Sequence, residues 1–98
     1  HLTEAMDQIN QLVEQFPDSA LAYAARAGIE AERGMHLLAE YDYSEALLRD
    51  PTNKDYLLAR IEELIALERY ADARKNLDLL VGMGISRVSL RSYYDRLH

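Results

Sequence analysis

An internal repeat with a period of about 34 residues is the feature of this sequence that most limits the folds open to the chain. Pro17 and Pro51 are one period apart, and Arg26 and Arg60 are separated by the same step. Several series of apolar residues follow that step in one register: Ala5, Ala39 and Ala73; Ile9, Tyr43 and Leu77; Leu12, Ala46 and Leu80; Val13, Leu47 and Val81. Because chance does not produce so many series in one register, we expect a chain built from repeated structural units.

Within each period, the apolar residues are spaced as on one face of an α-helix. Ala39, Tyr43, Ala46 and Leu47 follow the i, i+4, i+7, i+8 pattern. Alanine and leucine are abundant and β-branched residues are few, which favours helix over strand. Short breaks with proline or glycine separate the runs and favour antiparallel packing of consecutive helices. The predicted helices cover about residues 3–16, 19–33, 36–49, 54–67, 70–82 and 87–97, with Asp18 and either Thr52 or Asn53 as N-caps.

The period and the pattern of residues 22–51 resemble the tetratricopeptide repeat, a helix–turn–helix unit of about 34 residues. The matching residues are Tyr23, Ala27, Gly34, Ala39, Tyr43, Ala46, Asp50 and Pro51. The next unit departs from the pattern, with Leu57 for the aromatic, Ile61 for the small residue and Glu68 for the turn glycine. The resemblance implies an all-α fold, a right-handed α-solenoid of antiparallel helix hairpins in a single domain over residues 1–98. Its parts would be the second helix of a partial repeat (2–17), two full repeats (18–51 and 52–85) and a terminal capping helix (86–98).

Arg26 and Arg60 lie on a face that is expected to pack, so each needs a partner. An unpaired buried charge is costly, and the alternative is that both side chains extend to solvent. Many repeats of the family that the sequence resembles carry Asp opposite such an arginine, and the matching residues here are Asp42 and Asn76. We therefore predict an Arg26–Asp42 ion pair and an Arg60–Asn76 hydrogen bond.

His36 and Glu40 are one helical turn apart, which raises the question of a catalytic or metal-binding pair. Zinc takes three or four ligands, and the only other histidines are His1 and His98 at the two ends of the chain. The repeat register aligns His36 with Tyr70, a packing position. The chain has no cysteine, so disulfides and thiolate ligands are excluded. We expect no catalytic residues, no metal site, no cofactor and no enzymatic activity.

Charge and hydropathy exclude further classes of partner. The net charge is −6 and no cluster of Lys and Arg is present, so binding to nucleic acid is not expected. No apolar run approaches the ~20 residues of a membrane-spanning helix, so direct membrane insertion is not expected either. The chain begins with His1 rather than Met, and we expect an excised piece of a longer protein whose targeting segment lies elsewhere. Localisation stays open between the cytoplasm and the periplasm or cell envelope.

The resemblance also implies a concave groove, because stacked helical hairpins line their inner side with the first helix of each unit. The expected lining is small and apolar: Leu21, Ala24, Ala25, Gly28, Ala31 and Glu32 in the first unit, and Asp55, Leu58, Ala59, Glu62, Ile65 and Ala66 in the second. Family members that grip a C-terminal carboxylate use Lys and Asn where this chain has Ala24, Gly28 and Ala59, so that clamp is not expected.

These features predict a non-enzymatic protein-interaction module or scaffold that binds a protein or peptide segment in the groove. The alternative is a structural spacer or assembly segment of a larger protein that self-associates through its exposed terminal helices. The groove residues carry the function in the first case, and the open ends of the stack carry it in the second.

Overall fold

The computed structural model describes residues 2–97, with side chains from residue 4 onward, and none of these residues lies in a strand. The helices are α1 (Leu2–Gln15), α2 (Ala20–Glu32), α3 (His36–Arg49), α4 (Lys54–Ala66), α5 (Tyr70–Gly82) and α6 (Arg91–Asp95), with a short 3-10 helix, η1 (Val88–Leu90), before α6. The all-α class and the expected six helices are thus confirmed for this part of the chain. The prediction of one continuous last helix over 87–97 is wrong, because Leu90, at φ −101° and ψ 5°, separates η1 from α6.

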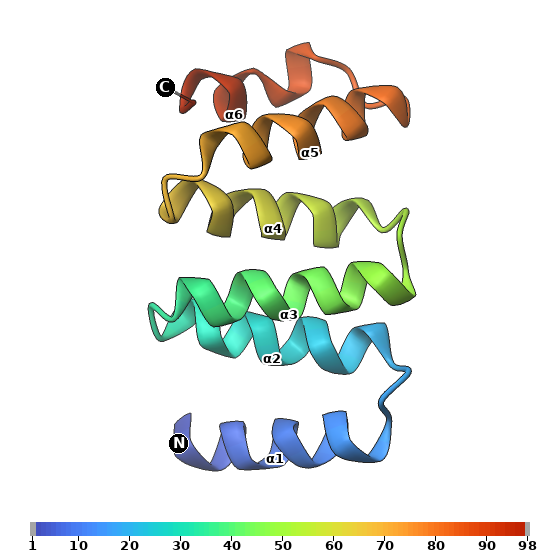
Figure 1. Ribbon diagram of the computed structural model, residues 1–98, viewed down its shortest axis with the longest axis vertical. Helices are drawn as coiled ribbons and strands as arrows, with labels where there is room; N and C mark the ends of the chain where they lie inside the picture. Colours follow the sequence, from blue (N-terminus) through green and yellow to red (C-terminus); the bar gives the residue numbers. More distant parts are fainter. Residues whose placement is uncertain (1, 98) are drawn as a thin grey trace.

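The helices are stacked in chain order along the longest dimension of the molecule, which measures 39 × 24 × 18 Å (Figure 1). Each helix contacts the next one along the chain, from α1 with α2 through to α5 with α6. The connecting loops fall alternately at the right and left edges of Figure 1, and α1 and α6 occupy opposite ends of the stack. The result is a helical, repeat-like fold.

The first helix of each unit begins with the same kind of N-cap, at positions one repeat period apart. The Ser19 hydroxyl accepts a hydrogen bond from the backbone N–H of Ala22 at 3.1 Å. The Asn53 side chain accepts one from the backbone N–H of Tyr56 at 3.0 Å. The prediction of Asn53 is confirmed and that of Asp18 is wrong by one residue, because the extended backbone of Ser19 (ψ 107°) points its hydroxyl at the first turn of α2.

The turns within the two units also have the same geometry, although their sequences differ. Gly34 has φ 75° and Glu68, one repeat later, has φ 59°. Their N–H groups donate to Ala31 and Ile65 at 3.0 and 2.9 Å. Glycine adopts this left-handed conformation freely, whereas glutamate does so at a cost. The backbone of the turn is therefore retained in the second unit without the residue that favours it.

The interior changes character along the stack. The largest fully buried side chains are Ile61, Leu64, Leu77 and Leu80, all in the unit formed by α4 and α5. The unit formed by α2 and α3 buries alanines together with charged side chains; its buried members include Ala27, Ala39, Ala46, Glu30, Glu40 and Asp42. The apolar core thus lies toward the C-terminal part of the molecule, and a polar network lies in the middle.

Within residues 2–97, no helix has both the length and the apolar character required to cross a membrane.

Candidate functional site

Arg26 is at the centre of a polar network that joins the first three helices. Its Nε and Nη2 atoms donate to the two carboxylate oxygens of Asp42, both at 2.8 Å. Its Nη1 atom donates to Oδ1 of Asn10 on α1 at 3.2 Å. The hydrogen bond with Asp42 raises the pKa of Arg26 above its ordinary value. The predicted Arg26–Asp42 pair is confirmed, and the bidentate geometry between a half-buried arginine and a buried aspartate gives it a structural role.

Arg60 makes a matching set of contacts one repeat later. Its Nη1 atom donates to Oδ1 of Asn76 at 3.2 Å, which confirms the predicted hydrogen bond. Its Nε atom also donates to Glu40 at 3.2 Å, a contact that was not predicted. Glu40 accepts further hydrogen bonds from Arg69 at 2.8 Å and Ser44 at 2.6 Å. Burial alone would raise the pKa of Glu40, but hydrogen bonds from Ser44 and Arg60 outweigh it and the pKa lies below its ordinary value.

His36 and Glu40, considered above as a possible catalytic or metal-binding pair, have different partners in the structure. Nδ1 of His36 lies 2.8 Å from Oε1 of the buried Glu63 on α4, while Glu40 is held by the arginines described above. Among the described residues, no group of three His, Cys, Asp or Glu side chains is placed to hold a metal ion. His1 and His98 lie outside the described residues. His36 therefore links α3 to α4 rather than forming a site with Glu40.

Glu30 has a buried carboxyl group, which was not predicted from the sequence. Its residue is 5% exposed, and its Oε1 atom has no hydrogen-bond partner among the described residues. Burial and the neighbouring Asp42 raise its pKa to about 8, and Arg26 opposes this only in part. The available signal was the repeat register, which aligns Glu30 with the fully buried Leu64.

The residues predicted to line a groove differ in accessibility. Leu21, Ala25, Glu32, Asp55 and Ala66 are exposed; Gly28, Ala31, Leu58, Ala59, Glu62 and Ile65 are half-buried; Ala24 is buried. Leu58 and Ile65 pack against the apolar core of the α4–α5 unit. Both carboxylate oxygens of Glu62 accept hydrogen bonds from Arg96, at 2.9 and 3.0 Å. Leu21 and Ala25 line one common pocket, and the groove as a whole stays a prediction.

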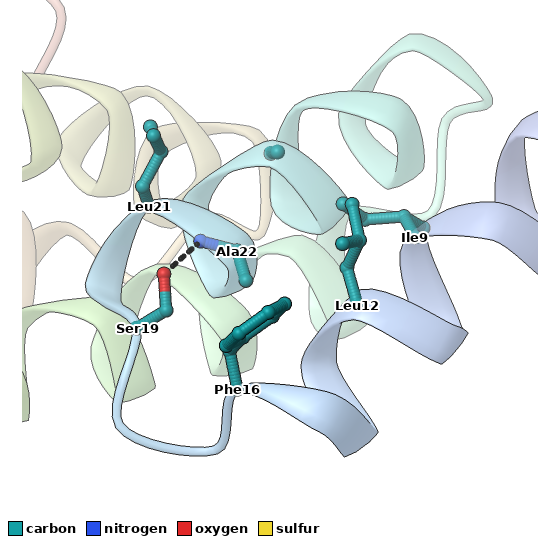
Figure 2. A pocket seen from close by; sticks show the side chains of 7 residues that line it. Ile9, Leu12, Phe16, Ser19, Leu21 and Ala22 are labelled. Carbon is teal, nitrogen blue, oxygen red and sulfur yellow. Dashed lines mark hydrogen bonds between the residues drawn. The ribbon is translucent and has the colours of Figure 1, made fainter.

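That pocket lies between α1 and α2 and has a volume of about 280 Å³. Its lining is Ile9, Leu12, Phe16, Ser19, Leu21, Ala22 and Ala25. Figure 2 shows Ile9, Leu12 and Phe16 on one side of the pocket, with Ser19 and Ala22 on the other. Leu12, Phe16 and Leu21 are 44%, 56% and 70% exposed, so apolar surface is open to solvent here. The contribution of the α1 side was not predicted, although Phe16 is the only phenylalanine of the chain.

A second apolar pocket lies at the opposite end of the stack. It has a volume of about 360 Å³ and is lined by Arg87, Val88, Arg91 and Tyr94. Val88 is 81% exposed and is the most exposed large apolar residue of those described.

Comparison with known proteins gives no relative for this chain: no family model, no curated protein and no solved structure matches it. Its function is therefore argued from its own residues.

Proposed function

We propose that the chain is a tetratricopeptide-like module, a right-handed α-solenoid of antiparallel helix hairpins that works as a non-enzymatic protein-interaction scaffold. The repetition of backbone features supports this proposal, since the N-caps Ser19 and Asn53 and the turn residues Gly34 and Glu68 each recur after one repeat period. The alternation of loops between the two edges of the stack supports it as well (Figure 1). Repeat folds of this kind commonly present extended surfaces for partners.

One observation carries the proposed binding role: accessible residues with little or no side chain recur on the first helices of both units. On α2 they are Ala25, Gly28 and Ala31, and on α4 they are Ala59 and Ala66. A Cβ added to Gly28 would meet nothing closer than the Tyr43 hydroxyl at 3.9 Å, so the glycine is not demanded by packing inside the protein. Small residues let the backbone of a partner helix or extended segment approach closely.

The charged residues beside this surface indicate which charges a partner segment should carry. Glu32 and Asp55 are exposed members of the predicted groove, and neither makes an ion pair with another described residue. With a net charge of −6, the chain favours a partner segment with apolar side chains and flanking Lys or Arg. Because these carboxylates are exposed, the attraction between partner and groove weakens as the salt concentration rises.

Peptide selection followed by NMR tests the proposed surface. Peptides are selected from a random display library on the 98-residue chain and titrated into the ¹⁵N-labelled protein. We expect selected peptides to combine apolar and cationic residues and to shift the amide signals of α2 and α4. Ala59→Glu and Ala66→Glu place a carboxylate on the small surface and should weaken binding about tenfold or more, a loss of about 1.4 kcal/mol.

Leu37→Glu is the matched control, because Leu37 is a 65% exposed leucine on α3, outside the predicted groove. It should leave peptide affinity unchanged. Circular dichroism confirms that each variant stays helical. Selected peptides that shift signals outside α2 and α4, or that bind the alanine variants at full affinity, would refute the proposal.

A further inference from the structure

We propose that two copies of this chain form a symmetric dimer through the outer face of α3. This face, here called the α3 strip, presents Leu37, Leu38, Tyr41 and Leu48, which are 65%, 48%, 59% and 73% exposed. Their positions fall within about 100° around the helix axis, so they form one surface. Helix α3 lies midway along the stack, with α1 and α2 on one side and α4 and α5 on the other (Figure 1). The strip is therefore open although other helices flank α3 on both sides, and it lies outside the proposed groove on α2 and α4.

The repeat register shows that these apolar side chains are specific to α3. Tyr41 aligns with Asp7 on α1 and with Lys75 on α5, and both of these residues are exposed. The remaining equivalents on α1 and α5 are also polar, charged or small: Glu4 and Asp72 for Leu38, Glu14 and Gly82 for Leu48, and Thr3 and Ala71 for Leu37. A cluster of exposed apolar side chains on one helix, where the equivalent helices have none at these positions, indicates a surface that a partner covers.

The α1 side of the strip carries negative charges that have no partner. Helix α1 has three acidic residues, Glu4, Asp7 and Glu14, and no basic residue. All three are exposed, and none forms an ion pair with another described residue. This side of the α3 strip therefore attracts cationic groups.

The α5 side of the strip carries positive charges that have no acidic partner. Arg74 and Lys75 are exposed, and neither forms an ion pair with another described residue. Arg74 contacts only the ring of Tyr94, with its Cζ atom 5.7 Å from the centroid. The acidic residues of α5 are already paired within the chain, Asp72 with Arg69 and Asp78 with Arg87. This side of the α3 strip therefore attracts anionic groups.

This charge pattern selects a second copy as the occupant of the α3 strip. In a symmetric dimer both copies use the same surface, so that surface must be complementary to itself. Asp7 and Lys75 each lie one repeat period from Tyr41, in opposite directions along the stack. A two-fold axis parallel to α3 places Tyr41 against its counterpart and α1 of each copy against α5 of the other, so that opposite charges meet twice. A two-fold axis along the stack would instead place α1 against α1, where the free carboxylates repel one another.

Sedimentation velocity and light scattering on the 98-residue chain test this proposal. Between about 10 μM and about 1 mM, the mean mass should rise from that of a monomer to that of a dimer and no further, because a symmetric contact closes on itself. Raising the salt to about 0.5 M should shift the mass back toward the monomer, because the flanking charges are exposed.

Substitutions in the α3 strip test its place at the centre of the contact. Tyr41→Glu and Leu48→Glu each bring two carboxylates together across the two-fold axis and should raise the dissociation constant of the dimer about tenfold or more. Val88→Glu is the matched control, because Val88 is an 81% exposed valine of η1, away from α3. It should dimerise like the unchanged chain.

An exchange of charges tests the placement of α1 against α5. Asp7→Lys and Lys75→Glu each set like charges against one another at two places in the dimer, and each should raise the dissociation constant about fivefold. The combined variant with both substitutions restores opposite charges at both places and should dimerise as well as the unchanged chain.

A chain that stays monomeric up to about 1 mM would overturn the proposal. So would growth beyond a dimer, a dimer that Tyr41→Glu leaves intact, or a combined charge variant that dimerises no better than the single ones. All substituted residues are exposed, and circular dichroism confirms that the variants are folded. Ala59→Glu should dimerise normally while losing peptide binding, and Tyr41→Glu should bind the selected peptides at full affinity. Failure of this proposal is therefore distinguishable from failure of the proposed groove.

Discussion

The unit formed by α2 and α3 and the unit formed by α4 and α5 have the same backbone plan but differ in the size and polarity of several matched buried side chains. Where the first unit has Ala27, Glu30 and Ala46, the second has Ile61, Leu64 and Leu80. All six residues are buried. The first unit thus buries small and charged side chains at these positions, and the second buries branched aliphatic side chains.

This difference shows that the repeat constrains the backbone of each unit more strongly than it constrains the side-chain contacts that stabilise the unit. A bidentate ion pair needs its full set of partners, because removing one leaves a buried charge. An apolar interior tolerates change more gradually, in proportion to the volume lost. The first unit should therefore respond to single substitutions at charged positions much more strongly than the second.

The largest expected difference concerns the two arginines. Arg26→Met leaves Asp42 buried without its cation and should lower the free energy of unfolding by about 3–5 kcal/mol. Arg60→Met leaves the neutral Asn76, and Glu40 keeps Arg69 and Ser44, so the loss should be about 1–2 kcal/mol. Urea denaturation followed by circular dichroism measures both.

Arg33→Met is the matched control for this pair, since Arg33 is an exposed arginine and should change stability by no more than about 0.5 kcal/mol. Equal losses for Arg26→Met and Arg60→Met would show that the ion pair is not what distinguishes the two units.

The second prediction is a pH dependence that only the first unit should have. The pKa of Glu30 is raised from 4.5 to about 8, so the folded state retains a proton that the unfolded state releases. The stability contribution is therefore complete below about pH 4.5 and is lost as the pH rises toward about 8. Glu30→Leu installs the residue of the second unit and should stabilise the protein by about 2–4 kcal/mol at pH 9, with little effect at pH 4.

Urea denaturation at a series of pH values measures the effect of Glu30→Leu. Glu32→Leu, at an exposed carboxylate on the same helix, should leave the pH dependence unchanged. A stability gain from Glu30→Leu that is the same at pH 4 and pH 9 would contradict a raised pKa for Glu30.

The N-caps should respond alike in the two units, because their geometries match. Ser19→Ala and Asn53→Ala each remove one hydrogen bond to the first turn of a helix and should each cost about 1 kcal/mol in the free energy of unfolding. Thermal unfolding by calorimetry measures the two losses. Thr52→Ala is the control, because Thr52 is exposed and does not cap α4. A loss confined to one of the two caps would show that the units differ in backbone energetics as well as in their interiors.

The smallest expected effect is at the left-handed turns. Glu68→Gly relieves a φ of 59° and should raise the free energy of unfolding by about 0.5–1 kcal/mol. Gly34→Ala should lower it by a similar amount, about 1 kcal/mol, although there is open space around the added methyl group. Equilibrium denaturation detects both changes. A loss of stability in Glu68→Gly would indicate that the glutamate side chain contributes more than its backbone conformation costs.

The sequence predicted most of what depends on periodicity. Observed helix bounds lie close to the predicted ones except in the last segment. The arginine partner Asp42 was predicted from the resemblance to the tetratricopeptide pattern, and Asn76 as its equivalent one repeat later. The Arg60–Glu40 contact was missed because Glu40 aligns with Arg74, so the register offers no precedent for it. The tetratricopeptide assignment and the predicted groove stay predictions.

The candidate sites were less predictable because they depend on what surrounds each side chain. Leu12 belongs to the same apolar series as the fully buried Ala46 and Leu80, yet it is 44% exposed and lines the pocket between α1 and α2. Ala24 was expected in the groove and is 8% exposed. Positions one helical turn apart can differ in burial. The pattern of residue types does not decide which of them is buried, because that depends on how neighbouring helices pack.

The sequence by itself determined the all-α class, the repeat period and the breaks between helices, because spacing, proline and glycine act locally along the chain. Only the tertiary structure decided that His36 meets Glu63 rather than Glu40, that Glu30 is buried beside Asp42, and that apolar pockets open at both ends of the stack. These outcomes depend on distances between side chains on different helices, which the order of residues along one helix does not specify.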